Sequence, residues 1–333
     1  MSLAASVLSG DRYSLARLLT QVENDLPEGR DALAELFSHT GNAHLIGVTG
    51  APGTGKSSLV NQLALHYRKR EGRRVGIVAV DPSSPFTGGA VLGDRVRMRD
   101  LSGDPGVFIR SMASRGSLGG LARATAAVVQ VFDAAGFEVI LIETVGAGQA
   151  EIDIARLAHT TLVVEAPGLG DDIQAIKAGI LEIADILIVN KADRPGVENT
   201  EKALKSTLEL AHPARRIFHH HGIDMPVEAG ATARGGMWLP PILRAISTEG
   251  TGIPEVALAI ARHGEYLRQT GDWAARERAR LEAELDTLIR EALVTRFHAQ
   301  TAAQEYERAI EQMVKRQLSP WEAARSLLNG RSP

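Results

Sequence analysis

The sequence of 333 residues contains no cysteine, which excludes disulfide bonds, thiolate metal sites and cysteine nucleophiles. It also lacks an excess of positive charge, because 37 basic residues are balanced by 40 acidic ones. We therefore expect no nucleic acid and no anionic membrane as a partner. There is no run of about 18 apolar residues and no leader-like pattern at the amino terminus. These absences predict a cytoplasmic protein that neither crosses a membrane nor is exported.

The remaining composition is ordinary for a globular protein, with 44% hydrophobic and 23% charged residues. Short apolar runs alternate with longer helical segments, which is the pattern of a parallel sheet with crossover helices. The runs are rich in Val, Ile and Leu, as in strands covered on both faces. The sequence therefore predicts an α/β fold with a mostly parallel sheet, with strands over 45–49, 74–80, 138–142, 161–165, 186–189 and 242–246.

Helical periodicity marks both ends of the chain. Near the start, apolar residues recur at helical spacing after Asp11, a suitable cap, and a second short helix is expected over 31–37 after a turn at 27–29. The final helix has a typical start, with a capping hydroxyl, a proline and a reciprocal carboxylate in Ser319, Pro320 and Glu322. Before it, one apolar stripe predicts a helix that either packs on the main domain or forms a dimer seam: Leu281, Leu285, Leu288, Ala292 and Phe297.

The strongest motif lies between the first expected strand and the helix after it. Its two glycines are separated by four residues and followed by Lys and Ser: Gly50, Ala51, Pro52, Gly53, Thr54, Gly55, Lys56 and Ser57. In such a loop, backbone amides converge on a phosphate at a helix amino terminus and the lysine adds a positive charge. The serine hydroxyl is suited to coordinate magnesium. The motif predicts nucleotide binding, and Ser58 is an additional expected contact.

A second motif, Asn190, Lys191, Ala192 and Asp193, follows the expected strand 186–189. A carboxylate such as Asp193 accepts hydrogen bonds from both N1 and the exocyclic amino group of guanine, a donor pair that adenine lacks. Asn190 and Lys191 are expected to shape the base pocket. A surface turn is the competing interpretation, but the position downstream of a phosphate loop and directly after an apolar strand favours guanine.

Three acidic residues are candidates for holding magnesium and the attacking water. Asp81 and Glu143 each follow an expected strand, and the carboxyl ends of parallel strands meet at the ligand-binding edge of the sheet. Asp94 is the third candidate. Arg95 and Arg97 are candidates either for stabilising transition-state charge or for a structural role.

The residues after Glu143 predict slow hydrolysis. Gly146 is followed by Ala147, where many GTPases place the glutamine that positions the attacking water, and Gln149 comes three residues after Gly146. Phosphoryl transfer depends mainly on positioning and electrostatics. We therefore expect the isolated protein to hydrolyse GTP slowly and a partner to accelerate the reaction.

Taken in order, these stretches resemble the MeaB/ArgK family of GTPases, the metallochaperones associated with adenosylcobalamin-dependent acyl-CoA mutases such as methylmalonyl-CoA mutase. The likeness covers roughly residues 15–266, and its specific segments are 50–57, 81–85, 92–98, 116–120, 143–151, 167–182 and 190–193. It implies a phosphate-loop domain flanked by amino-terminal helices and a carboxyl-terminal dimerisation arm. We accordingly expect a helical segment over 1–40, a GTPase domain over 41–270 and, in a homodimer, a helical dimerisation region over 271–333.

The resemblance also implies roles for individual residues. Lys56 and Ser57 would hold phosphate and magnesium, and around the metal and the attacking water would lie Asp81, Asp94 and Glu143. Guanine would be read by Asn190, Lys191 and Asp193. The last guanine-contacting loop would fall at Ile246, Ser247 and Thr248, with Thr248 where alanine is usual.

Two further stretches carry weaker hypotheses. The segment 167–177 resembles a family switch segment, because its glycines permit rearrangement and Asp171, Gln174 and Lys177 offer polar contacts. A plain helix start capped by Asp171 is the competing interpretation. Three adjacent histidines, His219, His220 and His221, suggest a metal site, but consecutive strand side chains alternate between faces and seldom converge on one ion.

The sequence and the resemblance together predict a magnesium-dependent GTPase that binds GTP and GDP. The resemblance implies that it gates cofactor loading, protection or repair of an adenosylcobalamin-dependent acyl-CoA mutase. The chain has no Asp-x-His-x-x-Gly signature, so we expect no cobalamin bound directly. Three alternatives stay open: a nickel-delivery GTPase, a nucleotide-gated interaction module with incidental turnover, and a kinase acting on arginine.

Overall fold

The computed structural model describes residues 2–82, 98–101, 103–114, 120–144, 154–168, 183–211, 237–301 and 303–328. The chain forms two compact units, Met1–Arg280 and Leu281–Pro333. Helix α11 (Asp272–Gln300) begins in the first unit and continues into the second. None of the described helices is long and apolar enough to span a membrane.

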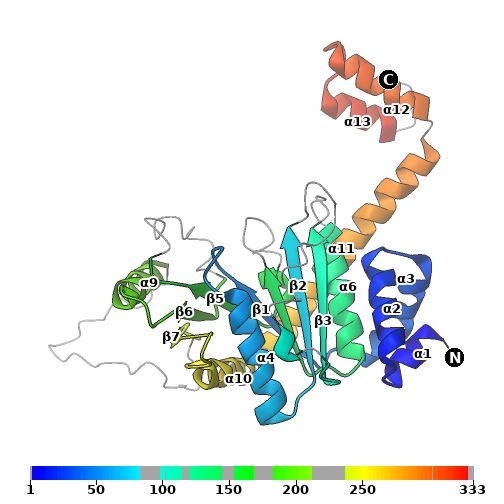
Figure 1. Cartoon of the computed structure of the whole chain (residues 1–333). Helices are drawn as coiled ribbons and strands as arrows, with labels where there is room; N and C mark the ends of the chain where they lie inside the picture. The colour runs from blue at the N-terminus through cyan, green and yellow to red at the C-terminus, as the bar shows by residue number, and fades with distance from the viewer. Residues whose placement is uncertain are drawn as a thin grey trace. The chain divides into compact units, whose positions relative to one another are not determined.

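The first unit is built on a seven-stranded sheet in the order β3, β2, β4, β1, β5, β6, β7 (Figure 1). Every neighbouring pair runs parallel, which confirms the predicted α/β fold. Because β1 lies between β4 and β5, the loop that follows it emerges at a topological switch point, where open α/β sheets bind ligands. The strands are β1 (His44–Thr49), β2 (Val75–Pro82), β3 (Val107–Ser114), β4 (Val139–Thr144), β5 (Thr160–Glu165), β6 (Ile186–Asn190) and β7 (Ile242–Ala245).

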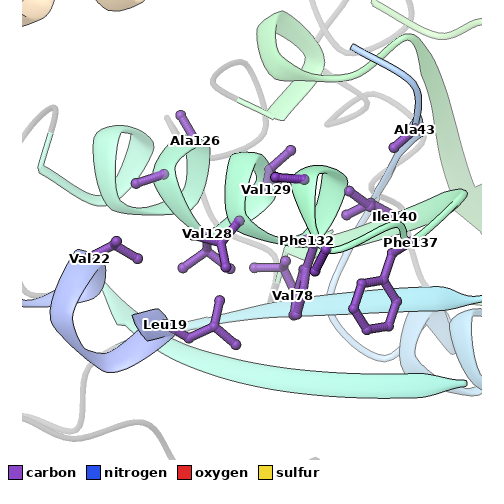
Figure 2. Packing of buried hydrophobic residues seen from close by; sticks show 14 of the residues in the cluster. Leu19, Val22, Ala43, Val78, Ala126, Val128, Val129, Phe132, Phe137 and Ile140 are labelled. Atoms are coloured by element: carbon purple, nitrogen blue, oxygen red, sulfur yellow. The ribbon is translucent and has the colours of Figure 1, made fainter. Parts of the chain in front are cut away.

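Helices cover both faces of this sheet because successive strand residues point to opposite sides. Val78 of β2 belongs to a core with Phe132 and Leu19, whereas its neighbour Ile77 packs in a second core with Leu59. Figure 2 shows the first core, where Leu19 and Val22 lie close to the helix that carries Val128 and Phe132. The helices of this unit are α1 (Leu3–Leu8), α2 (Arg12–Glu23), α3 (Pro27–Leu36), α4 (Lys56–Glu71), α6 (Gly120–Ala134), α9 (Val197–Ala211) and α10 (Ile253–Thr270), with short 3-10 helices at Phe37–His39 and Arg99–Leu101.

The amino-terminal helices match one prediction and correct another. Helix α2 begins after Asp11, whose carboxylate accepts a hydrogen bond from Ser14 N at 2.9 Å, as expected for a cap. The predicted turn at 27–29 is wrong, because Pro27 is the first residue of α3 and has a position that suits proline. Gly29 lies inside α3, where an added Cβ would come within 2.9 Å of the Gln21 carbonyl carbon. That glycine serves close helix packing.

Strand β3 was not predicted from the sequence. It is an edge strand that pairs with β2 alone, and its residues from Phe108 to Ser111 are only half-buried. Its polar Arg110 is accommodated because the guanidinium donates from Nε to Glu23 at 2.9 Å. An edge strand with an internal arginine does not produce the continuous apolar run that identifies the central strands.

The second unit is helical, with the end of α11 followed by α12 (Ala303–Val314) and α13 (Pro320–Leu328). The predicted start of α13 is confirmed: Glu322 N donates to Ser319 Oγ at 3.3 Å, and Ser319 N donates to Glu322 Oε2 at 3.1 Å. The stripe residues Leu281, Leu285 and Leu288 are 37%, 58% and 42% exposed. A dimer seam on this stripe stays a prediction.

Candidate nucleotide-binding site

The glycine-rich loop joins the buried end of β1 to the start of α4, as the motif predicts. Gly50 has φ 138°, and a Cβ at this position would come within 2.1 Å of the Val164 carbonyl oxygen of β5. A side chain is therefore excluded where the chain leaves the sheet. Because α4 begins at Lys56, directly after Gly55, the loop amides and the positive end of the helix dipole lie at the same place.

Lys56 is held within this loop. Its ammonium donates to the carbonyl oxygens of Gly50 at 2.7 Å and Ala51 at 3.0 Å, and the residue is 6% exposed. Thr54 is fully buried and its hydroxyl donates to the Ala51 carbonyl at 2.9 Å. Pro52, Gly53 and Ser58 remain exposed. The loop thus combines a fixed positive charge with an accessible rim, which suits an anionic ligand.

Ser57 and Glu143 meet in the structure although they are distant in sequence. The Ser57 hydroxyl donates to Glu143 Oε1 at 2.5 Å, and both residues are buried. Glu143 lies in β4 opposite Val48 of β1, so the strand pairing sets its position beside the loop. Hydroxyl and carboxylate oxygens are the ligands that Mg²⁺ prefers, so this pair fits the predicted metal. The two could hold the ion with the substrate phosphates.

The other two predicted metal ligands are less fully described. Asp81 is the seventh residue of β2 and lies near the carboxyl end of the strand that pairs with β4. Its backbone is therefore at the ligand-binding edge, and its side chain is outside the described part of the structure. Asp94, Arg95 and Arg97 lie entirely outside the described residues, as do Gly146 and Gln149.

Asn190 connects three parts of the site. Its amide nitrogen donates to the Thr54 carbonyl at 2.8 Å, and its amide oxygen accepts from Ser247 N at 3.1 Å and Ser247 Oγ at 2.8 Å. Gly55 permits this approach, because a Cβ there would lie 2.4 Å from Asn190 Nδ2. The end of β6, the phosphate loop and the loop after β7 are thereby held as one framework, and Asn190 is 2% exposed.

Lys191 and Asp193 follow at the open side of this framework. Lys191 has a φ of 56°, and its ammonium donates to the Gly53 carbonyl at 2.6 Å. Asp193 lies in a turn closed by the Arg194 N to Lys191 O hydrogen bond and is exposed. An exposed carboxylate beside a lysine fixed to the phosphate loop is accessible to a base.

The predicted last guanine loop adjoins the same framework. Ile246 pairs with Thr251 across a short turn, which directs buried Ser247 towards Asn190 and leaves Thr248 exposed. The structure thus brings this loop together with both sequence motifs. The segment 169–177 and His219, His220 and His221 lie outside the described residues. Among the described residues, no group of three or more His, Asp or Glu side chains forms a candidate metal site.

One contact at the site was not foreseen. The Thr144 hydroxyl donates to the Thr49 hydroxyl at 3.2 Å, which joins the ends of β4 and β1 next to Glu143 and the phosphate loop. Both threonines are buried. In the sequence, each threonine is a polar residue at the end of an apolar run, which was the available signal for this site. Their contact could not be predicted because it depends on the order of the strands in the sheet.

Comparison with known proteins identifies the family. A family model described as methylmalonyl-CoA mutase-associated GTPase MeaB matches residues 15–302. A protein of Pyrococcus abyssi that is named as a GTPase is 44% identical over 319 residues, covering 96% of this chain and 93% of that one. The mitochondrial methylmalonic aciduria type A homolog of Caenorhabditis elegans is 28% identical, covering 88% of this chain and 72% of its own.

A solved structure supports the fold. The crystal structure of a LAO/AO transport system kinase superimposes with a TM-score of 0.67 at 24% identity, covering 98% of this chain and 95% of that chain. At this identity the match supports the shared phosphate-loop architecture alone. With the family model covering most of the residues and relatives named as GTPases, the chain belongs to the MeaB family of GTPases.

Proposed function

We propose that the protein is a magnesium-dependent GTP hydrolase that serves as a chaperone for an adenosylcobalamin-dependent acyl-CoA mutase. The observation that carries the hydrolase part is the framework in which Asn190 joins the phosphate loop to the loop of Ser247. Both motifs adjoin one accessible side of the sheet, which supports the proposal because a nucleoside triphosphate must reach both of them.

Each candidate residue has a proposed role at this edge. Lys56 and the loop amides bind the phosphates, and the exposed carboxylate of Asp193 reads the guanine edge between Lys191 and the loop of Ile246, Ser247 and Thr248. The metal would be held by Ser57 and Glu143 together with Asp81 and Asp94. When bound, magnesium neutralises charge on the phosphate oxygens.

Catalysis in this proposal depends on position and charge. Glu143 is fixed by its bond to Ser57, and Lys56 is fixed to the loop carbonyls, so both are positioned before GTP binds. No glutamine directly follows Gly146 to orient the attacking water. We therefore expect a slow reaction that a partner accelerates.

The chaperone role rests on family membership. The family description names association with methylmalonyl-CoA mutase, and the Caenorhabditis elegans relative is named for methylmalonic aciduria. We propose that GTP binding and hydrolysis gate cofactor loading, protection or repair of the mutase, with cobalamin bound by the mutase. The exposed leucine stripe of α11 is proposed as the seam of a homodimer.

The experiment that tests this proposal measures GTP turnover by the full chain with magnesium, alone and with adenosylcobalamin mutases of different acyl-CoA specificity. Acceleration by one mutase supports both activity and partner class. Slow turnover that no mutase changes retains the hydrolase and contradicts the chaperone role. Glu143→Gln is the control, since it keeps the size of the side chain and removes its charge, and turnover should fall to background.

A further inference from the structure

The amino ends of β1, β5 and β6 meet in a buried polar cluster that the nucleotide site does not use. His44 begins β1, Thr160 begins β5 directly after His159, and Asp185 precedes β6. All four are less than 9% exposed. These four residues form one cluster with His263 of α10 and with Trp273, Arg276 and Glu277 of α11. We call this set of eight residues the joint.

Asp185 is one of two carboxylates in the joint, with Glu277. Its carboxylate accepts from both terminal nitrogens of Arg276 at 2.9 Å each, and from Thr161 N at 2.8 Å. Arg276 also donates to the His159 carbonyl at 2.6 Å. One arginine of α11 is therefore bonded to the starts of both β5 and β6.

The partners of His159 determine its tautomer. Nδ1 accepts the backbone N–H of Leu45 at 3.1 Å, so the ring proton is on Nε2, which donates to Glu277 at 2.5 Å. The ring also stacks on Trp273, with centroids 3.8 Å apart. A second proton would occupy Nδ1 and remove the acceptor for the buried Leu45 amide. This side chain satisfies its partners only when it is neutral.

Thr160 joins two further histidines of the joint. The Thr160 hydroxyl lies 2.8 Å from His44 Nε2 and 2.9 Å from His263 Nδ1, and His263 Nε2 lies 3.3 Å from Asp185. The Thr160 hydroxyl links the two histidines, because a hydroxyl both donates and accepts hydrogen bonds.

We propose that the joint fixes the first two turns of α11 to the strands leading to the phosphate loop and the Asn190 motif, and that it stays closed only while His159 is neutral. The strand geometry supports the first part, since β1 and β6 begin at the joint and end in those two motifs. The tautomer of His159 supports the second. This inference is independent of the proposed mutase partner.

The electrostatic setting agrees with the geometry. Burial lowers the pKa of His159 below its ordinary value of 6.5 and outweighs the opposing effect of Glu277. Protonation of His159 therefore favours an open joint, in which this ring has lost its contacts. The closed joint loses stability as the pH falls below 6.5. Asp185 and Glu277, each with a pKa lowered to about 2, stay ionised in this range. Among the described residues, the other charged or titratable groups around the joint are His44, Arg73, His263, Tyr266, Arg268, Asp272, Arg276 and Arg280.

The test follows α11 in the full chain between about pH 7.5 and pH 5.5, where histidine titrates. Hydrogen exchange of amides 273–280, corrected for the intrinsic effect of pH, should rise as the pH falls, because protonation of His159 removes the acceptor for the Leu45 amide and opens the joint. The emission of Trp273 should change in parallel because opening of the joint ends the stacking of its ring on His159. Trp273→Phe identifies the signal of this tryptophan.

The matched variant is His159→Gln, whose amide can accept from Leu45 and donate to Glu277 without titrating. It should keep slow exchange and constant Trp273 emission across the range. The same pH response in this variant, or none in the wild type, would overturn the proposal. If His159→Gln does not fold, Glu277→Gln serves instead: without this carboxylate nothing opposes the effect of burial on the pKa of His159, so the joint should open more between pH 7.5 and pH 5.5 than in the wild type. An unchanged or smaller response in this variant contradicts the proposal.

Discussion

The two ends of the strands use polar residues in opposite ways. We call the carboxyl ends the open edge of the sheet and the amino ends the closed edge. At the carboxyl ends of the strands, Asn190 is buried beneath an open surface where Asp193 and Thr248 are exposed. At the amino ends, His159 is covered by Trp273 of α11. The first arrangement keeps polar groups accessible to a ligand, and the second satisfies them internally. We therefore expect one end of the same strands to serve ligand binding and the other to serve stability.

The largest effect is expected from Asp185→Ala at the closed edge. The change leaves Arg276, His263 and the Thr161 amide without their carboxylate, and removing one partner of a buried ion pair costs about 3 to 4 kcal/mol. Thermal unfolding should show this loss, while the preference for guanine over xanthine nucleotides is retained. Asp286→Ala is the control, because this α11 carboxylate is 69% exposed. Equal effects of the two changes would contradict the assignment of stability to this edge.

Lys56→Ala probes the open edge. Removing the buried ammonium should weaken GTP binding by a factor of about 100, or ~2.7 kcal/mol, measured by calorimetric titration. The nucleotide-free protein loses the hydrogen bonds from Lys56 to the Gly50 and Ala51 carbonyls, so thermal unfolding of both proteins should be measured to separate lost stability from lost affinity. Lys69→Ala removes an exposed charge from the same helix and should leave affinity unaltered. Unchanged GTP affinity in Lys56→Ala would remove the loop from the binding site.

Asp193→Asn sharpens the comparison within the open edge. Replacing an acceptor by a donor should weaken GDP binding by about 2 kcal/mol, the value of a hydrogen bond to a charged group, and favour xanthine nucleotides. Competition between GDP and XDP measures the exchange of preference. Glu198→Gln, a nearby exposed carboxylate in α9, provides the control. An unchanged ratio would exclude Asp193 from the base pocket.

The smallest effect is expected in the second unit, at the start of α13. Ser319→Ala removes the hydroxyl that caps α13 and should destabilise that helix by about 1 kcal/mol. Hydrogen exchange over 320–328 should accelerate, whereas Ser319→Asp, which retains a capping oxygen, should exchange like the wild type. Equal exchange in Ser319→Ala and the wild type would contradict the capping role.

The open edge of the sheet could be predicted from the sequence, whereas the joint could not. The central strands and the open edge depend on contiguous patterns, so the glycine loop and the Asn190 motif were recognised before their contacts were known. The joint depends on isolated residues from β5, α10 and α11 that become neighbours only after folding. His159 and Trp273 are separated by more than a hundred positions in the chain, and no local spacing relates them.

Strand β3 and helix α3 show two further limits. Edge position permits Arg110 within β3, and a proline and a glycine that usually indicate a turn instead begin α3 and allow it to approach α2. In each case a neighbouring element decides the outcome. Local propensity alone therefore gives the wrong reading at these positions.

The contact between Gly55 and Asn190 has a consequence for engineering. Any larger residue at position 55 would meet the Asn190 amide, which belongs to a motif 135 positions further along the chain. The phosphate loop is therefore not an independent module. A loop grafted from another nucleotide-binding protein must bring a compatible partner at position 190, and libraries that randomise either position alone will sample mostly mismatched pairs.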